Sequence, residues 1–342
     1  MQVKDASYHL GLRAGDTVVV RAKEEILATL DQRGRLDGMP FQPEMFAFCG
    51  KTLQVAKVAH KTCDTINKTG GRRVHDAVHL EGVHCNGSGH DGCQADCNLF
   101  WKEAWLRRAE GAPTARRTQG AGCTEADVQR AAHAAGEESS TDPTWVCQTT
   151  ALFEASEPLN WWDARQYVRD LTTRNHRLSH MLRLGAFAAF RMVLSRGVGY
   201  RLLIKMYNVF QKVRGGKPYP IAGGTIAVGQ QTPLEVSNLQ PGEWVVVRPI
   251  EEIRPTLNTA GFNRGMWFDQ EMVQYCGGRY RVQMRVDRLI HEKTGRMLQM
   301  KNPCIQLEAV HCRATCTMKR MGCPRAVNTY WRENWLRRET DA

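Results

Sequence analysis

Two stretches of this chain are nearly the same. The stretch "GDTVVVRAKEEI" begins at Gly15, and "GEWVVVRPIEEI" begins at Gly242, 227 positions later. The same offset holds without a gap to the His-Cys pairs that start at His84 and His311. After a short insertion, both copies close on similar stretches, "WKEAWLRR" and "WRENWLRR". The sequence therefore predicts a tandem duplication of a module of roughly 95 residues, the size of a small domain.

The segment between the two copies has a different character. Stretches such as "AEGAPTARRTQGAG" are polar and rich in Gly and Pro, which is typical of a linker. Later stretches have the periodicity of a helical hairpin, with one buried helix and one helix that carries a basic face. We therefore expect a first β module with a Cys-rich tail (1–108), a flexible linker (109–160), a basic helical insert (161–216) and a second β module with a Cys-rich tail (217–342).

The repeated module is expected to be rich in β-strands. The stretches "TLQVAKVA" and "RYRVQMRV" alternate as half-buried strands do, and short strands separated by glycines favour a small, strongly bent barrel. The opening "GDTVVVR" resembles the first strand of SH3-like and KOW-type barrels, whose members commonly bind RNA, DNA or peptides. The longer pattern "GDTVVVRAKEEILATLDQRGRLDGMPFQPEM", followed by "CG" and a Cys-rich tail, also resembles a group of uncharacterised bacterial proteins with tandem Cys-rich modules. That second resemblance implies no function.

The Cys-rich tails predict metal sites. The opening "MQVKDASYHLGLRAGDTVVV" has charges where a signal peptide has its apolar core, so we expect a cytoplasmic protein whose 12 cysteines are thiols or metal ligands. Each copy offers four thiols, the number that a closed tetrahedral zinc site requires. The predicted zinc ligands are Cys63, Cys85, Cys93 and Cys97 in the first copy and Cys304, Cys312, Cys316 and Cys323 in the second.

Other interpretations of these cysteines stay open. All of them could be buried thiols without a metal, and His60 together with Cys63 could serve the first site and leave Cys97 as a spare. The spacings are not those of ferredoxin-type iron–sulfur motifs, so zinc is the expected cofactor. The resulting fold class is α+β, with two homologous SH3-like β-barrels, each clamped by zinc, on either side of a helical insert.

The first copy is also rich in histidine. Where the second copy has other polar residues at the matched positions, as at Gln306 opposite His79, we expect side chains that face solvent or a site in both copies. Three histidines and a carboxylate could form a second, open metal site with room for water or substrate. The candidate catalytic residues are His60, His75, His79 and Glu81; ordinary surface histidines are the simpler interpretation.

The helical insert carries most of the net charge of +12. Between Leu171 and Pro220 there are ten basic residues and no Asp or Glu. A solvated helix face would explain basic residues, but such a face usually mixes both signs of charge. We therefore expect an anionic partner, nucleic acid first, with an acidic protein or a membrane surface as alternatives. The residues expected to contact it are Arg201, Lys205, Lys212 and Arg214.

These patterns together predict a zinc-binding, non-catalytic scaffold protein for an anionic partner, with nucleic acid favoured. The alternative is a metal-dependent enzyme of specialised metabolism that uses the His-rich site of the first module. The sequence has no phosphate-binding glycine loop, nucleophile elbow or HExxH motif, and whether the chain is an enzyme is left open. No apolar run in the sequence is long enough for a transmembrane segment.

Overall fold

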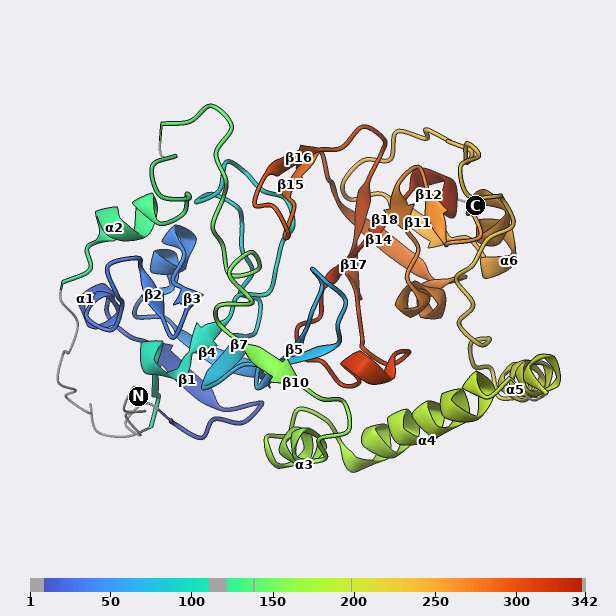
Figure 1. The fold of residues 1–342 in the computed structure, drawn as a ribbon, viewed down its shortest axis with the longest axis horizontal. Coiled ribbons are helices and arrows are strands. Elements are labelled where there is room, and N and C mark those ends of the chain that lie inside the picture. The colour runs from blue at the N-terminus through green and yellow to red at the C-terminus, as the bar shows by residue number, and fades with distance from the viewer. Residues whose placement is uncertain (1–8, 111–121, 138, 198, 340–342) are drawn as a thin grey trace. The chain divides into compact units, whose positions relative to one another are not determined.

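The computed structural model describes residues 9–110, 122–137, 139–197 and 199–339 (Figure 1). It is an α+β structure with several antiparallel sheets and a half-barrel. By its internal contacts the chain divides into two compact units. Unit 1 comprises 1–181, 288–298 and 319–326, and unit 2 comprises 182–287, 299–318 and 327–342. Two short segments that lie within the second repeat in sequence, 288–298 and 319–326, therefore belong to unit 1.

Unit 1 is built on a five-stranded sheet. Its strand order is β8 (Trp101–Lys102), β7 (Ala77–Leu80), β4 (Thr52–Val58), β1 (Thr17–Val20) and β9 (Leu106–Arg108). A smaller sheet has the order β10 (Glu157–Leu159), β6 (Gly71–Arg73) and β5 (Lys61–Cys63), and a hairpin joins β2 (Arg35–Leu36) to β3 (Met39–Pro40). The helices of unit 1 are α1 (Lys23–Leu27), α2 (Glu125–Arg130) and α3 (Arg165–Thr172).

Unit 2 is built on a second five-stranded sheet. Its strand order is β18 (Asn328–Trp331), β17 (Ile305–His311), β14 (Arg279–Arg285), β11 (Trp244–Val247) and β19 (Leu336–Arg338). A short hairpin pairs β12 (Phe262–Asn263) with β13 (Met266–Trp267). The hairpin of β15 (Arg288–Ile290) and β16 (Met297–Gln299) belongs to unit 1 except for Gln299. Helix α6 (Ile250–Ile253) follows β11, and the remaining helices are α4 (Leu178–Ser195) and α5 (Tyr200–Val213).

The two five-stranded sheets have the same strand order and matching registers. In unit 1, Val18 of β1 pairs with Arg108 of β9, and in unit 2, Val245 of β11 pairs with Arg338 of β19. Both pairs fall at positions that the sequence repeat matches, and both sheets are antiparallel. The description of the modules as homologous SH3-like barrels stays a prediction.

Buried tryptophans fill the same place in each unit. All four tryptophans of the two repeat endings are completely buried, as expected for residues that seal a core rather than stack on a ligand. The Phe41 and Trp105 rings meet edge to face with centroids 5.1 Å apart, and the Phe268 and Trp335 rings do so at 5.2 Å. The repeated endings therefore supply the aromatic core of both sheets.

A buried glutamate fastens the segment that precedes the first strand in each unit. In unit 1, Glu103 Oε2 accepts hydrogen bonds from the backbone N–H groups of Leu10 and of Gly11, the latter at 3.1 Å. In unit 2, Glu333 accepts from three successive backbone N–H groups, those of Ser237, Asn238 and Leu239. Because these bonds join matched positions, this carboxylate has an architectural role in both units.

The segment expected to be a flexible linker is partly built into unit 1. Gln148 is buried, and its side chain bonds the backbone of Phe100 in both directions, at 2.7 and 2.8 Å. Val128, Trp145 and Leu152 are buried as well. The polar composition of residues 109–160 suggests a linker, but these apolar side chains supply enough buried surface to hold the described part of the segment in place.

The helical insert also differs from its expected packing. Helix α4 was expected to be buried, yet Leu182, Met192 and Val193 on it are exposed, and Leu184 and Leu194 are buried. An almost wholly apolar sequence does not specify which face packs against a neighbour. In the described part of the chain, no helix is both long enough and apolar enough to cross a membrane.

A matched pair of variants tests the equivalence of the two cores. The Trp105 indole N–H donates to Thr29 Oγ1 at 3.2 Å, and the Trp335 indole N–H donates to Thr256 Oγ1 at 3.0 Å. Thr29→Val and Thr256→Val should each lower the free energy of unfolding by about 1–3 kcal/mol, because each leaves a buried donor unsatisfied. Urea denaturation measures the loss; a cost from one variant only would contradict equivalent cores.

Candidate metal centre

Three buried or partly buried ligand groups converge in unit 1. The ligand atoms of Glu44, Cys85 and His90 lie within 4.8 Å of one another. Among the described residues, one other group of three or more His, Cys, Asp or Glu side chains has this geometry, namely His9, Asp76 and Glu103. Neither predicted set of four thiols forms such a group in the described part of the chain, and the eight-cysteine assignment stays a prediction.

Glu44 is positioned by a short 3₁₀ helix, Pro43–Phe48. Proline at the first position favours the start of a helical turn, because its φ angle is already fixed. The Glu44 side chain is almost completely buried. Its Oε1 accepts from Gln42 Nε2 at 2.6 Å and from the Cys85 thiol at 2.8 Å. The carboxylate is thereby aimed at the Cys-rich tail that follows β7.

The loop after β7 brings Cys85 and His90 to this carboxylate. The Cys85 N–H donates to the Cys97 carbonyl at 2.8 Å, and the His90 N–H donates to the Gly87 carbonyl at 2.9 Å. Gly87 has φ of 72°, and a Cβ there would lie 2.1 Å from the Cys93 carbonyl oxygen, so the turn requires glycine. Because the His90 N–H is bonded to the carbonyl of Gly87, this turn holds His90 beside Glu44.

The orientation of the His90 ring leaves one nitrogen for the site. His90 Nε2 lies 3.1 Å from the Val146 carbonyl oxygen, so the ring donates a proton there. Nδ1 then faces Glu44 Oε1 at 3.7 Å. Within the described residues, His90 Nδ1 and Glu44 Oε2 have no hydrogen-bond partner although both are buried. A backbone carbonyl that fixes the ring while the other nitrogen stays available is the usual support of a metal-binding histidine.

The electrostatics of the group match its hydrogen bonds. Burial, and then the negative charge of Glu44, raise the pKa of the Cys85 thiol, so that it donates its proton to the carboxylate. Burial acts to raise the pKa of Glu44, but the neighbouring His90, and after it the hydrogen bond from Cys85, outweigh burial and leave the pKa below its ordinary value. In this arrangement the carboxylate is charged and the thiol is protonated.

The carboxylate at the matched position in unit 2 accepts hydrogen bonds from different donors. Glu271, the counterpart of Glu44, is buried, and it accepts from the Thr315 hydroxyl at 3.0 Å and from the Cys316 N–H at 2.5 Å. The offset of 227 holds as far as Cys85 and Cys312, and neither Thr317 nor Arg320, which lie 227 and 230 positions after His90, is a histidine. Unit 2 therefore uses the same carboxylate to hold its tail with neutral donors, and the converging imidazole is particular to unit 1.

Other predicted ligands gather around an arginine. The hydrogen bond with Cys323 lowers the pKa of the Cys63 thiol; burial opposes this effect, Arg325 adds to it, and the pKa falls to about 6. Arg325 is buried, and its pKa is raised by Glu292, Cys63, Cys97 and Cys323 against the opposing effect of burial. A guanidinium among these thiols already supplies the positive charge that a metal ion would bring.

The eight predicted ligands are therefore divided in a way that the sequence does not show. Cys323 belongs to unit 1, whereas Cys304, Cys312 and Cys316 belong to unit 2. Cys93 accepts from the Ile290 N–H at 3.3 Å, and Cys97 is partly exposed, with burial raising its pKa. The predicted grouping by repeat copy thus fails to anticipate the pairing of Cys63 with Cys323.

The candidate catalytic residues do not converge in the described structure. His60 is buried with Nε2 3.3 Å from the Gln166 carbonyl, and burial, then Lys61, lower its pKa to about 3. His79 is buried rather than solvent-facing, with Nδ1 2.9 Å from the Leu99 carbonyl. His75 lies 3.5 Å from Glu157. Glu81 is exposed.

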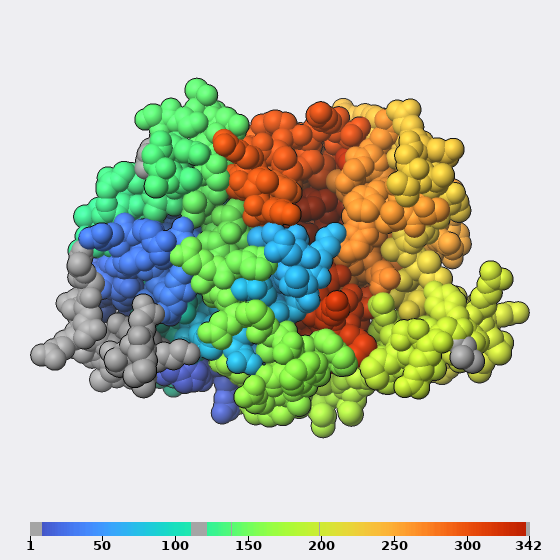
Figure 2. Space-filling view, viewed as in Figure 1, coloured from blue at the N-terminus to red at the C-terminus, as the bar shows by residue number. Residues whose placement is uncertain are grey.

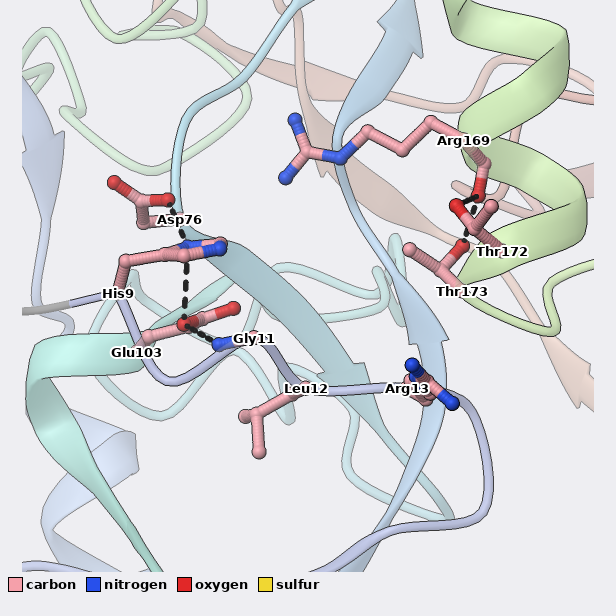
Figure 3. A pocket seen from close by; sticks show the side chains of 9 residues that line it. All are labelled: His9, Gly11, Leu12, Arg13, Asp76, Glu103, Arg169, Thr172 and Thr173. Carbon is pink, nitrogen blue, oxygen red and sulfur yellow. Dashed lines mark hydrogen bonds and ion pairs between the residues drawn. The ribbon is translucent and has the colours of Figure 1, made fainter.

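The second convergent group borders a cavity of about 490 Å³. Figure 3 shows His9, Asp76 and Glu103 facing one another, with Arg169 of α3 across the cavity. His9 Nδ1 lies 2.8 Å from Asp76 Oδ1 and 3.5 Å from Glu103 Oε2. Glu103 accepts hydrogen bonds from the backbone of Leu10 and Gly11, as Glu333 does from the matched segment of unit 2. This shared structural role explains why the group converges.

The basic residues of the insert lie where the sequence predicts. Arg201, Lys205, Lys212 and Arg214 are all exposed at or beside α5.

Comparison of the chain with family models, with curated proteins and with solved structures gives no match.

The sequence did not identify Glu44 and His90 as candidate ligands. A signal for Glu44 was present, because Glu44 and Glu271 occupy matched positions in the repeat. Its contact with the tail, however, depends on folding that brings residues 44 and 85 together. His90 is one of the five histidines between residues 60 and 90, and the feature that distinguishes it, the position of its Nδ1 beside Glu44, depends on the fold.

His79 should make the stability of unit 1 depend on pH. Burial lowers the pKa of His79 to about 4 from an ordinary value of 6.5, so the unfolded chain binds the proton first and stability falls as the pH drops from about 6.5 to about 4. The loss attributable to this residue is up to about 3 kcal/mol. The variant His79→Gln copies the buried Gln306. Its free energy of unfolding, measured by denaturation at a series of pH values, should fall less between about pH 6.5 and pH 4 than that of wild type. An identical fall in both proteins would contradict this assignment.

Proposed function

We propose that this chain is a zinc-binding, non-catalytic scaffold protein, with its metal centre at Glu44, Cys85 and His90. The observation that carries the proposal is the convergence of these three ligand atoms within 4.8 Å in unit 1. Its support is the pair of buried atoms, Glu44 Oε2 and His90 Nδ1, that have no hydrogen-bond partner among the described residues. A buried polar atom without a partner is costly, and a cation would satisfy both.

The donor set favours zinc over harder cations. A thiolate, an imidazole and a carboxylate are the ligands that Zn²⁺ takes, whereas Mg²⁺ and Ca²⁺ prefer oxygen donors alone. Two predicted ligands interact with the group electrostatically: burial, then Cys147 and Glu44, raise the pKa of Cys93, and Cys97 adds to the effect of burial and Glu44 on the pKa of Cys85. Either thiol could complete a closed, structural site.

The scaffold role belongs to the same proposal. Glu44 and its partners hold the tail of the first module, so a metal there would stabilise folding rather than present an open coordination position. The exposed basic residues on α5 support an anionic partner, for which nucleic acid is the expectation from sequence. The His-rich enzyme alternative gains no support from the positions of His60, His75, His79 and Glu81.

Elemental analysis of the purified protein tests the metal centre. We expect zinc at one ion per chain, lost in Glu44→Gln, Cys85→Ser and His90→Gln, because each variant removes one of the convergent ligands. Chelation should lower the melting temperature of wild type but not of these variants, since bound metal stabilises only the folded state.

Glu271→Gln is the matched control. It removes the counterpart carboxylate in unit 2, which is held by Thr315 and Cys316, and it should keep the full zinc content. Zinc that survives all three unit 1 variants would contradict the centre, and two ions per chain that depend on the eight tail cysteines would support the four-thiol sets instead.

A further inference from the structure

Helix α5 exposes an apolar stripe next to its basic residues. Five apolar side chains on it are between 57% and 84% exposed: Leu202, Met206, Val209, Phe210 and Val213. The helix is labelled in Figure 1, and Figure 2 shows that the segment, in yellow-green, contributes open surface to the viewed face. A contiguous exposed apolar patch on a folded protein usually marks an interaction site.

The helical period divides α5 into three parts. At 100° per residue, Arg201, Lys205 and Lys212 fall together on one edge of the exposed arc, and the apolar stripe occupies the rest of that arc. The opposite side is held within unit 2, where Ile204 is buried and Tyr207 stacks on Phe190 with ring centroids 5.3 Å apart. The packed side is thus already occupied, and the exposed arc combines cations with apolar surface.

The preceding helix extends the apolar surface without adding negative charge. On α4, Leu182, Met192 and Val193 are exposed. From Leu171 to Pro220 the chain has no Asp or Glu. We refer to α4 (Leu178–Ser195) and α5 (Tyr200–Val213) together as the hairpin.

We propose that the hairpin docks on the surface of an anionic lipid bilayer. This inference rests on the anionic partner of the proposed function and names its chemistry. In the interface, apolar side chains enter the boundary of the acyl chains while Lys and Arg stay at the headgroups, and negative headgroups attract a surface that has no acidic residue. The hairpin lies on the membrane rather than through it.

Charge and apolar surface together favour a bilayer over other partners. Nucleic acid would engage Arg201, Lys205 and Lys212 through phosphates but would leave the adjoining stripe of Met206 and Val209 in water. A second copy of this chain would bring like charges together without a carboxylate in either hairpin to pair with them. A bilayer with anionic headgroups accepts both parts of the exposed arc.

Vesicle flotation with the full-length protein tests this inference. We expect binding to vesicles of equal parts phosphatidylcholine and phosphatidylglycerol, weak binding to phosphatidylcholine alone, and partial loss of binding as salt increases. The double variant Met206→Ser/Val209→Ser should bind the anionic vesicles roughly tenfold less or weaker still, because it removes apolar burial at constant charge.

The matched control is Val228→Ser/Val236→Ser. These two valines are similarly exposed in unit 2 but lie outside the hairpin, so their loss should leave vesicle binding unchanged. Equal binding by the Met206/Val209 variant and wild type would overturn the inference. Binding to duplex DNA or RNA with none to vesicles would overturn it and keep the anionic partner. Binding to neither would overturn both, while the zinc centre would still be judged by metal analysis.

Discussion

Each module has to hold a long Cys-rich tail against a small sheet, and a buried glutamate does so in both. Glu44 and Glu271 are matched in the repeat and are both buried. A buried carboxylate is tolerated only where hydrogen bonds or a cation compensate its lost hydration. In unit 2, Thr315 and Cys316 provide that compensation. In unit 1 a thiol and an imidazole take their place, and the same constraint produces a potential metal centre.

A fixed guanidinium limits where else a metal could bind. Arg325 lies among Cys63, Cys97 and Cys323, and the negative charges around it raise its pKa. A second cation in that cluster would have to overcome repulsion from a residue that stays charged at any relevant pH. Cys63, whose pKa falls to about 6, thus already has a cationic neighbour within unit 1.

The sequence repeat was enough to predict which strands correspond, but not which tail residues meet. The 227-residue offset correctly matches β1 with β11, whose pairings with the last strand are equivalent. It also suggested that His79 faces a site or solvent because Gln306 is polar, whereas both side chains are buried. Polarity at matched positions does not separate a buried hydrogen-bonded residue from an exposed one. The contact between Cys63 and Cys323 joins segments 260 positions apart, and no local pattern encodes it.

Net charge likewise does not show which basic residues can bind an external partner, because some of them already have partners within the chain. In the modules, several arginines are structural: Arg21 donates to the Leu106 carbonyl at 3.0 Å, and Arg248 donates to the matched Leu336 carbonyl at 3.3 Å. Among the described residues, Arg201, Lys205 and Lys212 form no ion pair. Part of the charge available to an external partner thus lies on α5, where it adjoins exposed apolar side chains. Composition alone predicts a basic protein; only this placement distinguishes a surface suited to a bilayer from one suited to phosphates alone.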